Sequence, residues 1–255
     1  MHPDPDFADG LAALRPLGGF FVLRPPGPPP RRLPTLSQVY GDRPPDVHDD
    51  PLAFRVRKVE AALRAPEPRI AASVAHQGLA ARLWSVTLGC AAVYGAVPDL
   101  DPRLLHWDPD GSAPDDLWLA ELRPRPADTA TVADTVLHAH LLPLAGALRA
   151  RYRVAAGLLR GNAASALVGA AREVDRWAGR HGRTRAAART RSLTAGLLAH
   201  PLLAGAGTLT GTAFRRRSCC LYYRVPGGGV CGDCCFRHPP RFPPPPRSSP
   251  RAPSG

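Results

Sequence analysis

The sequence has little lysine and few cysteines, and each shortage bears on which classes of protein are compatible with it. Lys58 is the only lysine among 33 basic residues, while alanine, arginine, proline and glycine are abundant throughout the 255 residues. This bias weakens the formal net charge of +12 as evidence for a nucleic-acid partner. Six cysteines are too sparse for a small secreted disulfide scaffold. Since 44% of the residues are hydrophobic, the chain can bury a core without crosslinks, and collagen, coiled-coil and fully disordered classes are excluded.

Features of a membrane or secreted protein are also missing. The longest stretch without formal charge, residues 192–214, contains His200-Pro201, four glycines and four threonines. Because proline breaks a helix, we expect two short helices separated at Pro201 rather than a membrane span. The acidic N-terminus lacks the basic and apolar regions of a signal peptide. The sequence therefore predicts a cytoplasmic protein without an integral membrane segment, with peripheral association left open.

Charge and proline content divide the chain into regions. Residues 1–128 carry a net charge of −3 and residues 129–255 a net charge of +15. Six prolines fall within residues 24–34 and eight within residues 239–255, where regular structure is disfavoured. The division expected from these boundaries is an N-terminal region with a proline-rich linker (1–49), a helical domain (50–213), a cysteine-rich segment (214–238) and a disordered Pro/Arg/Ser-rich tail (239–255).

The region between the proline-rich ends has mostly helical periodicity. Apolar residues recur near helical spacing over 70–97, which predicts a long helix ended by the prolines of segment 98–102. Further helices are expected over 131–159 with a kink at Pro143, over 163–180 with Asn162 as N-cap, and over 183–203. Short strands are expected in 104–107 and 117–122. The predicted fold class is α+β, with a predominantly α-helical body, a small β element and a C-terminal cysteine-rich hairpin or loop.

Five of the six cysteines fall within 17 residues near the C-terminus: Cys219, Cys220, Cys231, Cys234 and Cys235. With Cys235 set aside, their spacing is C-C-x10-C-x2-C. Residues 221–225 have strand character and residues 226–229 form a turn signal, so a hairpin or folded loop would bring the two cysteine pairs together. Gly232 permits the tight backbone needed between two ligands of one centre.

Four convergent thiolates suit a metal centre, but the residues alone leave its type open. A zinc site normally uses two C-x2–4-C pairs, whereas Cys219 and Cys220 are adjacent and point apart on an extended backbone. A two-iron cluster is more tolerant because its terminal ligands are divided between two irons. The spacing thus favours an iron–sulfur cluster over zinc, with a disulfide between Cys231 and Cys234 as a third reading. Flanking arginines would stabilise an anionic cluster and raise its reduction potential, or form a phosphate-binding patch: Arg215, Arg216, Arg217 and Arg224.

The cysteine segment resembles the FhuF-like ferric-siderophore reductases, which carry a C-terminal 2Fe-2S domain. The resemblance lies in residues 216–224, 226–229 and 231–234, and extends more weakly to residues 79–85 and 161–167. It implies a 2Fe-2S cluster whose iron ligands are Cys219, Cys220, Cys231 and Cys234. Cys235 departs from this pattern as an extra thiol able to exchange with Cys234.

The resemblance implies one-electron reduction of siderophore-bound Fe(III) to Fe(II), with release of iron in the cytoplasm. Oxygen chelators hold Fe(III) more tightly than Fe(II), so reduction loosens the metal. No nucleotide-binding fingerprint occurs, so a separate electron donor is expected as a partner beside the ferric siderophore. Two alternatives remain: a zinc-binding basic module for nucleic acid, and a 2Fe-2S electron-transfer or iron-sensing protein without a siderophore substrate.

Other conspicuous residues are interpreted as structural. His76 is expected to be a satisfied surface or core residue rather than one that faces substrate. His138 and His140 are not expected to form a metal pair, because residues two apart point to different helix faces. Asn162 and Ser165 are expected to cap a helix, and Asp233 to lie in a turn. The remaining group is expected in the core: Trp84, Trp107, Trp118 and Cys90.

Overall fold

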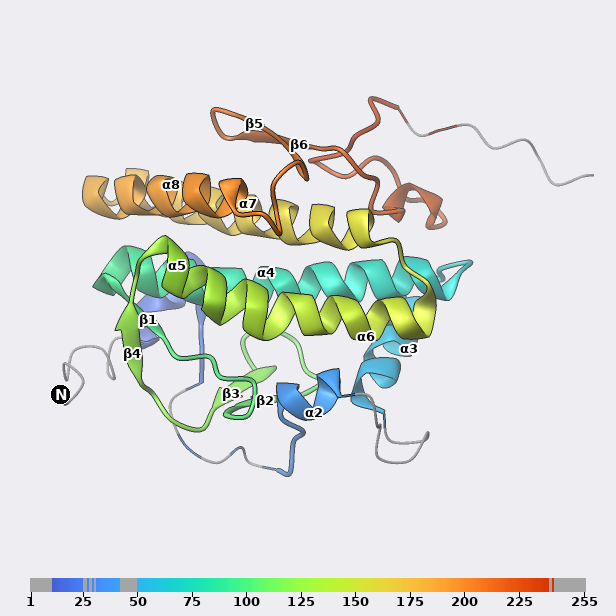
Figure 1. The fold of residues 1–255 in the computed structure, drawn as a ribbon, viewed down its shortest axis with the longest axis horizontal. Coiled ribbons are helices and arrows are strands. Elements are labelled where there is room, and N and C mark those ends of the chain that lie inside the picture. The colour runs from blue at the N-terminus through green and yellow to red at the C-terminus, as the bar shows by residue number, and fades with distance from the viewer. Residues whose placement is uncertain are drawn as a thin grey trace, which may run out of the picture.

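The computed structural model describes residues 11–24, 31–41 and 50–238, together with residues 27, 29 and 240 (Figure 1). The tail expected over 239–255 therefore lies outside the described residues, apart from residue 240. Helices dominate the described chain and the strands form three small antiparallel pairs. The predicted α+β class with a mainly helical body is confirmed.

The long helix α4 (Pro68–Tyr94) forms the centre of the fold. Pro68 opens it without losing a hydrogen bond, and Gly95 ends it in the left-handed conformation at φ 71°. Nearly every residue from Leu79 to Ala92 is buried, as expected for a helix covered on all sides. The prediction over 70–97 is confirmed, except that its last residues form strand β1 (Ala96–Pro98).

Two layers enclose α4, as Figure 1 shows. Helices α7 (Ala156–Arg180) and α8 (Thr184–Ala199) lie above it in this view, with the cysteine segment over α7. Below and beside it lie α2 (Leu36–Tyr40), α3 (Pro51–Leu63), α5 (Thr129–Val132), the π-helix η3 (Ala133–Leu141) and α6 (Leu142–Tyr152). The cysteine segment is thus seated on the helical body by way of α7.

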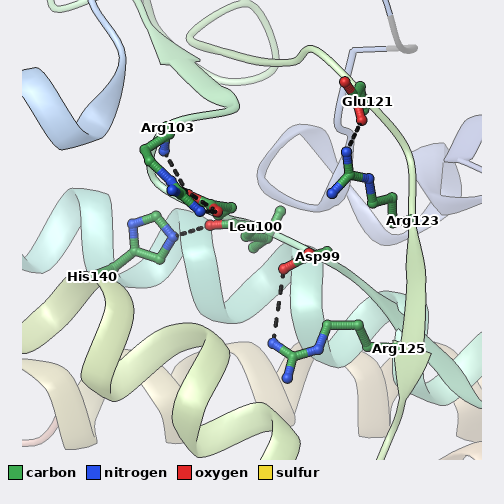
Figure 2. Close-up of polar contacts among 8 residues, drawn as sticks. Asp99, Leu100, Arg103, Glu121, Arg123, Arg125 and His140 are labelled. Atoms are coloured by element: carbon green, nitrogen blue, oxygen red, sulfur yellow. Dashed lines mark hydrogen bonds and ion pairs between the residues drawn. The ribbon is translucent and has the colours of Figure 1, made fainter.

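The small β element lies below α4. Strand β2 (Leu105–Trp107) pairs with β3 (Leu117–Leu119), so both strands expected from the sequence are confirmed. Strand β1 pairs with β4 (Pro124–Pro126), and Arg125 of β4 lies 3.8 Å from the Asp99 carboxylate (Figure 2). Nearby, the ring of His140 donates from Nε2 to the Leu100 carbonyl at 2.5 Å, which joins η3 to this region (Figure 2).

The helix predicted over 131–159 is wrong in its continuity. Arg153 takes the left-handed conformation (φ 53°) and ends α6, and α7 begins at Ala156. This break lets α7 run back along the body after α6 (Figure 1). Asn162 consequently lies inside α7 and is not an N-cap.

The pair of helices expected around Pro201 is also wrong. Helix α8 ends at Ala199, and the chain beyond Pro201 forms a hairpin of β5 (Gly207–Thr210) and β6 (Ala213–Arg216). Threonine and phenylalanine favour strands, and a Cβ on Gly207 would lie 2.4 Å from the Arg215 carbonyl oxygen. Among the described helices, none combines the length and apolarity needed to cross a membrane.

A buried ion pair fixes the N-terminal segment against α4. Arg82, 1% exposed, donates from Nε to Asp116 at 2.7 Å and from its two terminal nitrogens to the carbonyls of Phe20 and Val22 at 2.5 Å. A buried guanidinium needs such multiple partners to offset its desolvation. The contact holds η2 (Gly19–Phe21), and with it Phe20, beside the middle of α4.

Candidate functional site

The cysteine segment after β6 is a folded loop and not a strand hairpin. Leu221 takes the left-handed conformation (φ 69°), and Tyr222–Arg224 form the 3-10 turn η4, so the strand character expected over 221–225 is wrong. The loop folds back tightly, because a Cβ on Gly228 would lie 2.6 Å from the Tyr222 carbonyl oxygen. Of the hairpin and loop alternatives, the loop is confirmed.

This loop brings the two cysteine pairs into contact. The Cys220 sulfur lies 3.5 Å from the Cys231 sulfur, and every cysteine is a free thiol. The backbone N–H of Leu221 donates to Cys219 Sγ at 3.2 Å, and that of Phe236 donates to Cys234 Sγ at 3.4 Å. Such N–H···S bonds stabilise thiolate and shift the potential of an iron–sulfur centre bound by it.

Hydrogen bonds between neighbouring sulfurs shift the pKa values of these cysteines. The pKa of Cys220 is lowered because the thiols of Cys219 and Cys231 donate to its thiolate. The pKa values of these two donors are raised by the same hydrogen bonds, and burial raises that of Cys235. A metal centre would require all its thiol ligands to lose their protons, so binding releases protons here.

The donors do not converge on a single point. Within the part of the chain that the structure describes, no three His, Cys, Asp or Glu side chains are gathered as they would be around one metal ion. A tetrahedral zinc ion requires four donors around one centre. The contact between Cys220 and Cys231 joins one sulfur from each cysteine pair, and the terminal ligands of a two-iron cluster are divided between two irons.

A buried cation lies next to these sulfurs. Arg216 is 2% exposed and donates to Asn162 Oδ1 at 2.5 Å and to the Leu158 carbonyl at 3.3 Å, while its Nε has no partner. It forms no ion pair with a carboxylate among the described residues, and its charge helps lower the pKa of Cys220. An uncompensated buried charge is costly, and the Cys220 thiolate, whose pKa Arg216 helps to lower, provides a negative charge close to it. The donor set and this cation together fit an anionic metal–thiolate group.

The four arginines expected around the cysteines play different roles. Arg224 forms an ion pair with Glu67, and Arg215 is exposed and donates to the Cys235 carbonyl at 3.0 Å. Arg217 is exposed as well. Arg216 is therefore the one of these four whose guanidinium is buried beside the thiols.

Comparison with protein families agrees with this geometry. Residues 216–236 match the family model of the FhuF 2Fe-2S C-terminal domain. The cysteine segment is a FhuF-type 2Fe-2S domain. The match confirms the predicted resemblance and the 2Fe-2S cofactor, while the assignment of individual ligands and the domain boundaries stay predictions. No curated protein sequence matches the chain.

Helix α7 provides the docking face for the FhuF-type domain. Ser165 donates to Asp233 Oδ2 at 2.6 Å and Arg172 donates to Asp233 Oδ1 at 2.7 Å. Asn162 donates from Nδ2 to the carbonyl oxygen of Ser73 at 2.8 Å, and the Ser73 hydroxyl donates to the Cys220 carbonyl at 2.8 Å. The capping roles expected for Asn162 and Ser165 are therefore wrong, and Asp233 is a buried anchor as well as a turn residue. The signal available in the sequence was the three-residue spacing of Asn162 and Ser165, which places both side chains on one face of a helix.

Gly161 allows the domain to approach α7 closely. A Cβ at this position would lie 2.4 Å from Ser218 Oγ and 3.0 Å from the Arg216 guanidinium. We expect Gly161→Ala to destabilise the protein by about 1–3 kcal/mol, the usual cost of overpacking, and to weaken cluster retention. Chemical denaturation of the holoprotein, followed by helical and visible signals, measures both effects.

Gly169→Ala is the matched control, because Gly169 lies on the same helix as Gly161 and a Cβ there would meet nothing within 4 Å. It should be neutral or stabilising by about 0.5–1 kcal/mol, because alanine is the better helix former. Equal stabilities of the two variants would contradict the close approach at Gly161.

An open groove runs along the FhuF-type domain. It consists of two adjoining cavities, of about 510 and 360 Å³, that share the lining residues Phe20, Gln77, Ala81 and Cys231. Cys220 and Tyr222 line the smaller cavity, and Ser165 and Asp233 line the larger. We refer to it as the cysteine groove. It gives a bound molecule direct access to two of the thiols.

The other residues considered from the sequence are structural. His140 is buried, accepts from the Tyr40 hydroxyl at 2.9 Å and donates to the Leu100 carbonyl, so it is unavailable as a metal ligand beside His138. Trp84, Trp107 and Cys90 are in the core, as predicted, and Trp118 is half-buried under Arg24. His76 is buried, as expected of a packing residue, but its Nδ1 has no partner.

Proposed function

We propose that the protein reduces a ferric siderophore to its Fe(II) form by one-electron transfer in the cytoplasm, with Cys219, Cys220, Cys231 and Cys234 holding the cluster. The cysteine groove carries this proposal, because it is large enough for an organic ligand and two thiols lie in its wall. When bound, the 2Fe-2S cluster supplies single electrons at this wall. The match to the FhuF-type domain favours this reading over the zinc-binding one.

The residues of the groove suit an organic chelate. Phe20 and Tyr222 are 47% and 37% exposed and offer apolar contact, while Gln77 and Ser85 offer polar groups. Arg82 and its partners hold Phe20 in place, so this face is fixed before substrate arrives. These side chains orient the chelate; the cysteine segment closes the groove on one side.

The electron balance requires a second partner. Fe(III) in the chelate gains one electron and becomes Fe(II), whose weaker hold on hard oxygen ligands permits release. No nucleotide-binding motif occurs in the sequence, so the electron comes from a separate donor, a reduced protein or small carrier.

Blocking the groove tests the proposal. Gly78 lines the smaller cavity, is exposed, and has open space where a side chain would begin. Gly78→Trp should therefore fill the groove and lower the rate of ferric-siderophore reduction at least tenfold. The rate is measured by anaerobic stopped-flow mixing of the dithionite-reduced protein with the ferric chelate, using a ferrous-specific dye to trap the product.

The control is Gly179→Trp, another exposed helical glycine with open space and no place in the groove. It should reduce the chelate at the wild-type rate, and both variants should keep the visible spectrum of the cluster. If wild type and both variants hold an intact, reducible cluster but reduce no ferric chelate, the protein has an electron-transfer or sensing role instead.

A further inference from the structure

A second cavity lies between α4, α6 and α7. Its volume is about 250 Å³, and it shares no lining residue with the cysteine groove. Leucines and small residues from different elements form most of its wall, among them Leu141, Leu159 and Leu203. Leu142 at this cavity is 52% exposed. The cavity is therefore an apolar space accessible from the surface.

One polar side chain in this apolar wall lacks a partner. His76 is 1% exposed, and its Nδ1 is fully buried with no hydrogen bond in the described structure. Burial lowers its pKa to about 3, with a further contribution from Arg216, so the ring is neutral and offers one N–H and one lone pair. A buried polar atom without a partner is rare in native proteins. It makes this part of the wall polar, in contrast to the leucines around it.

The charges around the cavity are all positive. Arg149 and Arg160 belong to its lining and are exposed, and neither has a carboxylate partner within the described chain. No aspartate or glutamate lines the cavity. An apolar space surrounded by unpaired guanidinium groups favours a molecule with an apolar body and an anionic end.

We propose that this cavity binds a small carboxylic acid with an apolar body, its carboxylate between Arg149 and Arg160 and its body among the leucines beside His76. At about 30 Å³ for each water-sized group, the volume accommodates roughly eight non-hydrogen atoms. A medium-chain fatty acid has this size and chemistry. The site is separate from the cysteine groove, and the proposal does not depend on ferric-siderophore reduction.

Octanoate is a suitable probe, titrated by calorimetry into the full-length protein with its cluster intact. Octanoate should bind, and octylamine, which has the same chain and the opposite charge, should bind at least tenfold more weakly. Combined Arg149→Glu and Arg160→Glu substitutions should weaken octanoate binding at least tenfold. Arg185→Glu, an exposed arginine of α8 outside the cavity, makes the control and should bind as wild type does.

Ala145→Trp supplies an independent variant, because Ala145 is half-buried, lines the cavity and would fill it with apolar volume. It should abolish octanoate binding while leaving the cluster spectrum unchanged. The proposal is overturned if octanoate gives no binding signal, if octylamine binds equally well, or if the double arginine variant binds as Arg185→Glu does.

Discussion

Cys231→Ser is expected to leave the purified protein colourless, with iron and labile sulfide falling from about two of each per chain toward zero. Cys231 lies in contact with Cys220, lines the cysteine groove and begins the tight turn to Cys234. Serine oxygen is a harder and less readily ionised ligand than thiolate, so it replaces cysteine poorly at an iron–sulfur centre. Visible absorption and metal analysis of anaerobically purified protein measure the loss.

Cys235 provides the matched control within the same segment. Cys235→Ser should retain the full cluster, because the proposed ligands are Cys219, Cys220, Cys231 and Cys234. Cys234→Ser should retain part of its iron only if Cys235 replaces it, and the double variant should then lose the remainder. The ligand set would be wrong if the Cys235→Ser protein contained no iron while the Cys234→Ser protein contained two irons per chain.

The sequence predicted those helices that show continuous apolar periodicity along their own residues. The α4 helix has continuous apolar periodicity, so its existence followed from a local pattern, although Gly95 ends it three residues before the expected bound at residue 97. The break at Arg153 has no comparable signal, because no proline or glycine marks a left-handed residue there. The β5–β6 hairpin was not predicted, because the glycines and threonines of residues 192–214 served only as evidence against a membrane span, although they also suit a strand turn.

The candidate site likewise has features that the sequence predicted and features that it did not. The cysteine spacing is a local property and was sufficient to predict the cofactor that the FhuF-type match confirms. The residues that hold the segment in place are far from it in sequence: Ser73 lies 147 residues before Cys220, and Ser165 lies 68 residues before Asp233. Such contacts depend on the packing of α4 against α7, so a local pattern can place polar residues on one helix face but does not identify their partners. Asn162 was expected to be an N-cap because it directly precedes the helical pattern of residues 163–180 and asparagine is a favoured capping residue.

Arg216 illustrates the same limit and leads to a strong expectation. The sequence placed four arginines beside the cysteines without ranking them, whereas the structure buries Arg216 and pairs Arg224 with Glu67. A positive charge near an anionic cluster stabilises the reduced state, which carries one more negative charge. Removing the Arg216 charge should therefore lower the reduction potential.

Arg216→Gln is expected to lower the potential by about 60–130 mV, since a charge-assisted interaction of about 1.5–3 kcal/mol corresponds to that range for one electron. Arg216→Lys keeps the charge but loses the planar fork that reaches Asn162 and Leu158, so its potential should lie between those of Arg216→Gln and wild type. Arg217→Gln removes an exposed neighbouring charge and should shift the potential by less than about a third as much, because solvent screens it. Spectroelectrochemical titration of the four proteins decides the matter: equal shifts in Arg216→Gln and Arg217→Gln would mean that burial of Arg216 gives it no special influence on the cluster.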